Sequence, residues 1–165
     1  MAGDWGPPQT VLTHTADCLN AQGITVSACS SWIVSKAYGV KNQADFINGA
    51  LIVKTHKPPM SLLYTCQKIE RQAGRRPGPK WGPRVLDIDI LAYHDVIIGQ
   101  PGKSGVQSHS HRLILPHPGL AGRPFVLQPL AEIAPRWHHP LTGLTARQML
   151  RQLRPSRGGE IINHA

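Results

Sequence analysis

Residues Trp81–Tyr93 read W-G-P-R-V-L-D-I-D-I-L-A-Y, and the interpretation of the whole chain depends on this stretch. A stiff Gly-Pro turn precedes an aliphatic run that predicts a β-strand. Side chains alternate between the two faces of a strand, so Asp87 and Asp89 share one face. The other face carries Leu86, Ile88 and Ile90. We therefore expect a strand with one apolar face and one acidic face.

The two carboxylates indicate a metal site. They would lie roughly 6.5–7 Å apart along a strand, and buried charges normally persist by pairing or by binding a metal. Oxygen-only ligands favour Mg²⁺, which completes its coordination with substrate phosphates. Arg84 suits phosphate, and Trp81 suits stacking on a flat ring. The alternative is an edge strand with a solvated acidic face, because Asp-x-Asp is short and common, but the flanking Trp-Gly-Pro-Arg favours the site.

Composition predicts one basic, soluble domain. The chain has 165 residues, which predicts a single domain over 1–165 with a frayed tail over 154–165. The 18 Lys and Arg against 9 Asp and Glu give a net charge of +9, which attracts nucleic acid or a polyphosphate nucleotide. Basic clusters at 71–84 and 112–123 flank the acidic stretch and favour a phosphate site. The three cysteines do not have metal-binding spacing, and the sequence shows neither a long apolar run nor a signal peptide. These features predict a cytoplasmic protein.

The remaining segments predict helices and strands in mixed order. Apolar residues recur at helical spacing, and β-branched runs indicate strands. Helices are expected at 9–22, 60–73, 124–131 and 144–153, and strands at 24–34 and 46–55. This pattern predicts an α+β or α/β sandwich in which helices cover a mostly antiparallel sheet. Only three strong strands are predicted, so the sheet looks incomplete.

Other residues suit recognition of a nucleotide or a flat heterocycle. His117 lies between two prolines, which leave it few conformations, and Arg123 adds a fork-shaped donor. Phe46 and Asn48 share one strand face, so a ring and an amide could recognise one heterocycle; core packing is the alternative for Phe46. Gly102-Lys103-Ser104 lacks the earlier glycine of a phosphate-binding loop and is interpreted as a hairpin tip.

Two motifs resemble those of 6-hydroxymethyl-7,8-dihydropterin pyrophosphokinases, enzymes of folate biosynthesis. The motifs are W-G-P-R-V-L-D-I-D-I-L and L-P-H-P followed by R-x-F-V-L-x-P-L-x-E-I-A-P. The resemblance extends from about Asp4 to Leu153 and implies a ferredoxin-like sandwich. It also implies transfer of pyrophosphate from ATP to the hydroxymethyl group of the pterin, with release of AMP. The implied cofactor is a pair of Mg²⁺ ions held by Asp87 and Asp89.

The resemblance further implies roles for individual residues. The implied catalytic residues are Arg75, Arg84, Asp87 and Asp89. The implied ATP contacts are Gln67, Glu70, Arg84, Ile90, Arg112, His117 and Arg123. The implied pterin contacts are Ser35, Tyr38, Phe46, Asn48, Trp81 and Phe125. The expected partners are these small-molecule substrates, without membrane or specific nucleic acid, and the chain is expected to be a monomer.

The sequence departs from the family pattern in three places. The family's first, central strand, which ends in Gly-Ser-Asn, is missing ahead of the first helix. The loop Ser35-Lys36-Ala37-Tyr38 replaces a sequence close to Thr-Pro-x-x-Gly, and Gln100–Ser110 is an insert that should be tolerated. The missing strand suggests a catalytically impaired, truncated homologue as one alternative. The net charge suggests a basic nucleic-acid-binding α+β module as the other.

Overall fold

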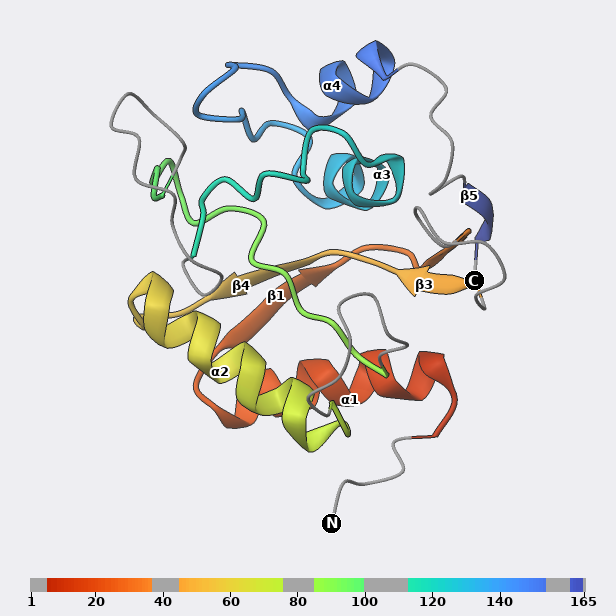
Figure 1. Ribbon diagram of the computed structural model, residues 1–165, viewed down its shortest axis with the longest axis vertical. Coiled ribbons are helices and arrows are strands. Elements are labelled where there is room, and N and C mark those ends of the chain that lie inside the picture. Colours follow the sequence, from red (N-terminus) through yellow and green to blue (C-terminus); the bar gives the residue numbers. More distant parts are fainter. Residues whose placement is uncertain (1–5, 37–44, 76–84, 100–112, 154–160, 165) are drawn as a thin grey trace.

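A computed structural model describes residues 6–36, 45–75, 85–99, 113–153 and 161–164. Two layers of helices enclose the strands (Figure 1). One layer holds α1 (Pro8–Ala21) and α2 (Pro59–Gln72), and the other holds α3 (Pro124–Ile133) and α4 (Ala146–Gln152). The described strands pair antiparallel. The predicted α+β class with a mostly antiparallel sheet is therefore confirmed.

Helices α1 and α2 form the first core together with the apolar face of the acidic stretch. Both helices carry proline in their first turn, where its missing N–H would have no partner within the helix. Gly23 has φ +73, which lets the chain turn back after α1. Ile24, Leu62 and Ile69 are buried in one cluster with Leu86. The segment that carries the two aspartates is thus packed directly on α2.

Each of the two long predicted strands is divided in two. The pairs are β1 (Thr25–Cys29) with β4 (Leu51–Lys54), and β2 (Ile33–Ser35) with β3 (Phe46–Asn48). At the division the Ser30 hydroxyl accepts a hydrogen bond from the Ala50 N–H at 2.9 Å, and the Trp32 ring lies against Gly49. A side chain that takes the place of a ladder carbonyl interrupts regular pairing. The hairpin therefore bends, and β2 and β3 belong to a separate sheet.

The prediction of a frayed tail over 154–165 is wrong for its last residues. Strand β5 (Ile161–His164) pairs antiparallel with β2 and gives the sheet order β3-β2-β5. The free edge of β2 offers backbone groups that an extended segment can pair with. Two successive isoleucines favour the extended conformation there. Residues 154–160 lie outside the described part of the chain.

The acidic stretch is extended, but the prediction of a strand is wrong for its described part. Residues 85–93 make no ladder with any strand that the structure describes and appear as a green coil in Figure 1. Exposure nevertheless alternates along it, with Leu86 only 6% exposed and Asp87 and Asp89 on the open side. The stretch and β4 line one large cavity.

A second core lies between α3 and α4. Leu120, Leu127 and Met149 are buried within it. Thr145 and Gln148 exchange hydrogen bonds at the start of α4, where each side chain accepts the backbone N–H of the other, at 3.2 and 2.8 Å. This core fixes the start of α3, which carries two predicted site residues. No described helix has the length and apolar character needed to cross a membrane.

Candidate active site

Asp87 and Asp89 present their carboxylates to the cavity. Each side chain is 47% exposed, and both belong to the open side of the extended stretch. The intervening Ile88 points into the first core. The alternation expected for a strand therefore places the two carboxylates as predicted, although no ladder holds them.

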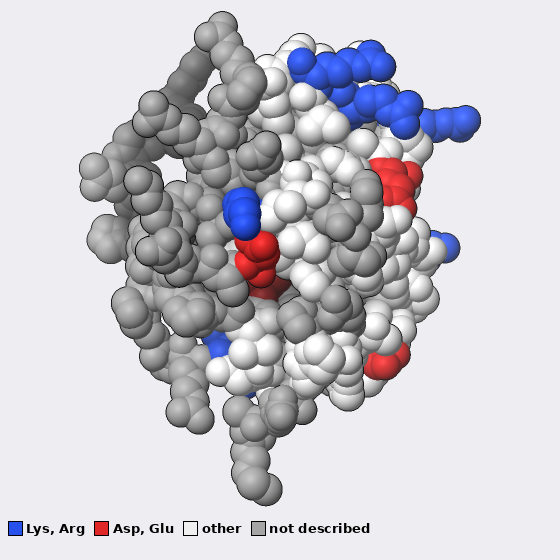
Figure 2. Space-filling model, turned by 90° about the vertical axis from the view of Figure 1, so that its right-hand side faces the viewer, with Lys and Arg blue, Asp and Glu red and all other residues white. Residues whose placement is uncertain are grey.

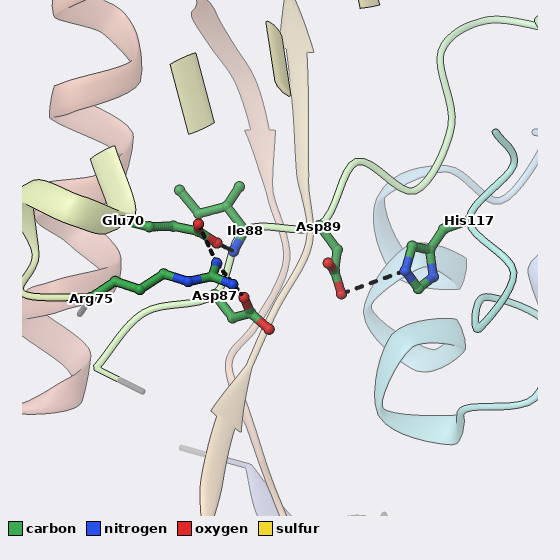
Figure 3. Close-up of polar contacts among 6 residues, drawn as sticks. All are labelled: Glu70, Arg75, Asp87, Ile88, Asp89 and His117. Carbon is green, nitrogen blue, oxygen red and sulfur yellow. Dashed lines mark hydrogen bonds and ion pairs between the residues drawn. The ribbon is translucent and has the colours of Figure 1, made fainter. Parts of the chain in front are cut away.

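A buried carboxylate from α2 contacts the acidic stretch from behind. Glu70 is only 2% exposed and accepts a hydrogen bond from the Ile88 N–H at 2.8 Å. The Arg75 guanidinium forms an ion pair with Glu70 and reaches Asp87 Oδ1 at 3.1 Å (Figure 3). Burial and the nearby Asp87 carboxylate raise the pKa of Glu70, while the Ile88 N–H and Arg75 act to lower it. Glu70 and Arg75 thus form one polar network with the peptide between the two aspartates.

His117 approaches the acidic stretch from the opposite direction. Its backbone N–H donates to the Leu91 carbonyl at 2.9 Å, and its Nδ1 accepts from the Gly119 N–H at 3.1 Å. The proton of the neutral ring therefore lies on Nε2, which is 3.9 Å from Asp89 Oδ2 (Figure 3). Burial lowers the pKa of His117, although Asp89 acts to raise it. The ring is a neutral donor beside Asp89.

Arg123 and Phe125 stand at the start of α3 and line the same cavity. The guanidinium carbon of Arg123 lies 5.9 Å from the centroid of the Phe125 ring. The guanidinium also passes over Gly119, where an added Cβ would lie 2.7 Å from its central carbon. Gly119 therefore leaves room for a cation that faces the site.

The cavity lining also includes an aromatic ring and an amide. Phe46 is 40% exposed, and Asn48 donates from Nδ2 to the Ser35 hydroxyl at 2.9 Å. Because Ser35 is buried at 2% exposure, this bond fixes the Asn48 amide. Trp32 also lines the cavity, and sequence reasoning missed it. Gly49, next to Asn48, could have indicated it, because a glycine has no side chain and leaves room for the Trp32 indole.

The cavity has a volume of about 1350 Å³ and brings together residues from distant parts of the sequence. The predicted site residues that line it are Ser35, Phe46, Asn48, Asp87, Asp89, Ile90, Arg123 and Phe125. Gln67 and Glu70 lie on α2 outside this lining. Arg75 and His117 also lie outside it, although Arg75 contacts Asp87 and His117 lies beside Asp89. Tyr38, Trp81, Arg84, Arg112 and the 100–110 insert lie outside the described residues.

The carboxylates of Asp87 and Asp89 fit a hard cation that also binds water and substrate oxygens. Among the described residues, no three His, Cys, Asp or Glu side chains form a group that could hold a metal. Asp87 and Asp89 supply oxygen ligands only, which suits Mg²⁺ completed by water and phosphate oxygens. A site of this kind depends on a phosphate substrate for its remaining ligands.

One face of the molecule carries charged side chains of both signs. Figure 2 shows an acidic cluster with a basic neighbour near the middle of this face, and other basic residues gathered at one edge. The described Lys and Arg residues do not form a continuous stripe on this face.

Comparisons with known proteins agree in family. The family model described as 7,8-dihydro-6-hydroxymethylpterin-pyrophosphokinase matches residues 2–135. A 2-amino-4-hydroxy-6-hydroxymethyldihydropteridine pyrophosphokinase of Synechocystis is 44% identical over 154 residues, which cover 93% of this chain and 73% of the relative. A relative of the same name from Methylorubrum extorquens is 41% identical, with 94% and 92% covered. A folic acid synthesis protein of Schizosaccharomyces pombe is 35% identical over 83% of this chain and 17% of its own length.

Proposed function

Because this chain belongs to the 7,8-dihydro-6-hydroxymethylpterin-pyrophosphokinase family and is a pyrophosphokinase of folate biosynthesis, we propose that it transfers pyrophosphate from ATP to 6-hydroxymethyl-7,8-dihydropterin. A bond forms between the hydroxymethyl oxygen and the β-phosphorus of ATP. The bond from the β-phosphorus to the oxygen of the α-phosphate breaks, and the hydroxyl proton passes to water. The products are AMP and the pterin diphosphate.

One observation carries this proposal: paired carboxylates and a heterocycle-binding set line the same cavity. Asp87 and Asp89 lie on one wall, and Phe46, Asn48 and Phe125 also face into it. A transfer enzyme without covalent chemistry of its own acts by positioning and by electrostatic stabilisation. Both substrates must therefore meet in one space, and a volume of about 1350 Å³ accommodates them.

The pterin is held at the Phe46 side of the cavity. The fixed Nδ2 of Asn48 leaves its Oδ1 to accept hydrogen bonds from the N–H groups along the pterin edge. Phe46 and Phe125 offer ring faces for stacking on the heterocycle. Tyr38 and Trp81, which lie outside the described residues, complete the pterin contacts in this proposal.

The triphosphate is held at the Asp87 side. Arg75 and Arg123, with Arg84 and Arg112 outside the described residues, supply positive charge for the phosphates. His117 donates from Nε2 toward the phosphates or Asp89. Asp87 and Asp89 would hold Mg²⁺, which when bound neutralises charge on the phosphate oxygens as the transfer proceeds. We also propose that the enzyme acts as a cytoplasmic monomer, consistent with three free cysteines.

The test is formation of AMP and pterin diphosphate by the purified chain with ATP, Mg²⁺ and the dihydropterin. Asp87→Asn and Asp89→Asn should each lower kcat/KM by about 100-fold or more, because a bound metal contributes several kcal/mol to such a transfer. Asp95→Asn is the matched control, since Asp95 is exposed beyond the cavity lining. Wild-type activity in both cavity variants would refute the metal assignment. No turnover by the wild-type chain would refute the proposed function.

A further inference from the structure

We propose that Glu70 is a positioning residue that sets the place of Asp87 and Asp89 by holding the peptide between them, and that it does not contact the nucleotide. This inference rests on the proposed function only for its effect on turnover. The hydrogen bond between Glu70 and the Ile88 N–H is present in the folded protein without substrate. It replaces the direct ATP contact that the resemblance implies for Glu70.

The first support is the state of the backbone at the acidic stretch. Residues 85–93 have no ladder partner among the described strands, so their N–H groups depend on other acceptors. The Ile88 N–H finds the Glu70 Oε1 at 2.8 Å. Ile88 stands between the two aspartates, so this one bond restrains the carboxylate on each side of it. A charged acceptor makes the bond stronger than an ordinary amide–carbonyl bond.

The second support is that Glu70 is fully engaged. It is only 2% exposed and belongs to the buried stripe of α2 with Cys66 and Ile69. Oε1 accepts from Ile88, and Oε2 is paired with Arg75. A buried carboxylate persists when its oxygens are hydrogen-bonded and its charge is paired. Both conditions are met within the protein.

The third support is the direction of Arg75. Its guanidinium bridges Glu70 and Asp87 (Figure 3). An arginine has five N–H donors, so pairing with these two carboxylates leaves donors for a phosphate. Glu70 therefore positions two elements of the site: the peptide at Ile88 and the cation beside Asp87. Residues next to a metal site that orient its ligands typically change affinity or activity 10- to 100-fold when replaced.

The experiment compares Glu70→Ala and Glu70→Gln with Gln72→Ala, a control at an exposed position of the same helix. Glutamine keeps an oxygen for the Ile88 N–H but loses the charge that pairs with Arg75. The first readout is hydrogen exchange of the Ile88 amide in the substrate-free protein, followed by NMR. The second is Mn²⁺ affinity in the presence of a non-hydrolysable ATP analogue. The third is the separation of kcat from the KM for ATP.

Glu70→Ala should speed Ile88 exchange at least about tenfold, weaken Mn²⁺ binding and lower kcat by about 10- to 100-fold, with the KM for ATP changed less than about threefold. Glu70→Gln should retain most of the Ile88 protection and lose less kcat than Glu70→Ala. It also serves as the test if the alanine variant does not fold.

A raised KM for ATP with unchanged Ile88 exchange in Glu70→Gln or Glu70→Ala would overturn the inference in favour of direct nucleotide contact. Unchanged exchange and unchanged kcat would overturn it as well. Ile88 exchange and Mn²⁺ affinity do not depend on turnover. An inactive wild-type chain would therefore refute the proposed function and still leave the positioning role decided by these two readouts.

Discussion

Gly49→Ala tests whether the Trp32–Gly49 contact shapes the pterin side of the cavity. An added Cβ would lie 2.1 Å from two ring carbons of Trp32 and 3.3 Å from the Ser30 hydroxyl oxygen. Ordinary contact begins near 3.4 Å, so the indole or the backbone must move by about 1.3 Å. Overpacking of this kind costs roughly 1–3 kcal/mol. We expect Gly49→Ala to lose that much stability.

The same substitution should weaken pterin binding. Gly49 follows Asn48 directly, and Trp32 lines the cavity beside it, so a displaced ring or strand moves the fixed amide. Urea unfolding gives the stability change, and steady-state kinetics gives the KM for the pterin. Gly122→Ala is the control, because a Cβ there meets nothing within 4 Å. We expect the KM for the pterin to rise in Gly49→Ala and to stay unchanged in Gly122→Ala.

The double variant Gly49→Ala with Trp32→Ala isolates the contact. Removing the indole removes the collision, so adding Gly49→Ala to Trp32→Ala should cost much less stability than adding it to the wild type. Equal costs in the two backgrounds would refute the reasoning, as would a Gly49→Ala variant that is as stable as Gly122→Ala.

Two further predictions concern the other wall and the core. In Gly119→Ala the new Cβ would lie 2.7 Å from the Arg123 guanidinium carbon and should push the guanidinium away from the cavity. We expect kcat/KM to fall with little loss of stability, because the displaced group is the end of a flexible side chain. Steady-state kinetics and urea unfolding measure the two effects, and an unchanged kcat/KM would contradict the prediction. Burial raises the pKa of the Cys66 thiol from 9.0 to about 11. Its contribution to stability is therefore complete below pH 9 and lost as the pH rises toward 11, so the stability difference between the wild type and Cys66→Ala should shrink over that range. A constant difference in urea unfolding would show that the thiol does not titrate as its burial requires.

Local patterns in the sequence predict what depends on local geometry. The apolar residues of α1 and α2 recur at helical spacing, and this spacing predicts both helices. Ile88 and Asp87 point to opposite faces because side chains alternate along any extended segment. These expectations needed no knowledge of distant residues. The family motifs then supplied roles that periodicity does not contain, and for site residues those roles stay predictions.

Contacts between distant residues could not be predicted from such patterns. Glu70 and Ile88 are 18 residues apart, and nothing in either segment indicates that a side chain of α2 accepts a backbone N–H. The Ser30 hydroxyl that bonds Ala50 across 20 residues is a similar case. This hydrogen bond lies where each of the two predicted strands, 24–34 and 46–55, is divided, although the composition of both segments predicts continuous strands. Tertiary hydrogen bonds decide these features, and propensity does not encode them.

The unpaired state of the acidic stretch has a consequence for the site. A strand within a ladder is held by many backbone bonds, so the loss of one side chain moves it little. Here the described stretch is held by its apolar face, by Glu70 at Ile88, by the His117 N–H at Leu91 and by the Tyr93 hydroxyl, which donates to the Lys57 carbonyl at 3.0 Å. The contacts at Ile88 and Leu91 come from different layers of the fold. The positions of Asp87 and Asp89 therefore depend on the packing of α2 and of the His117 loop against one cavity.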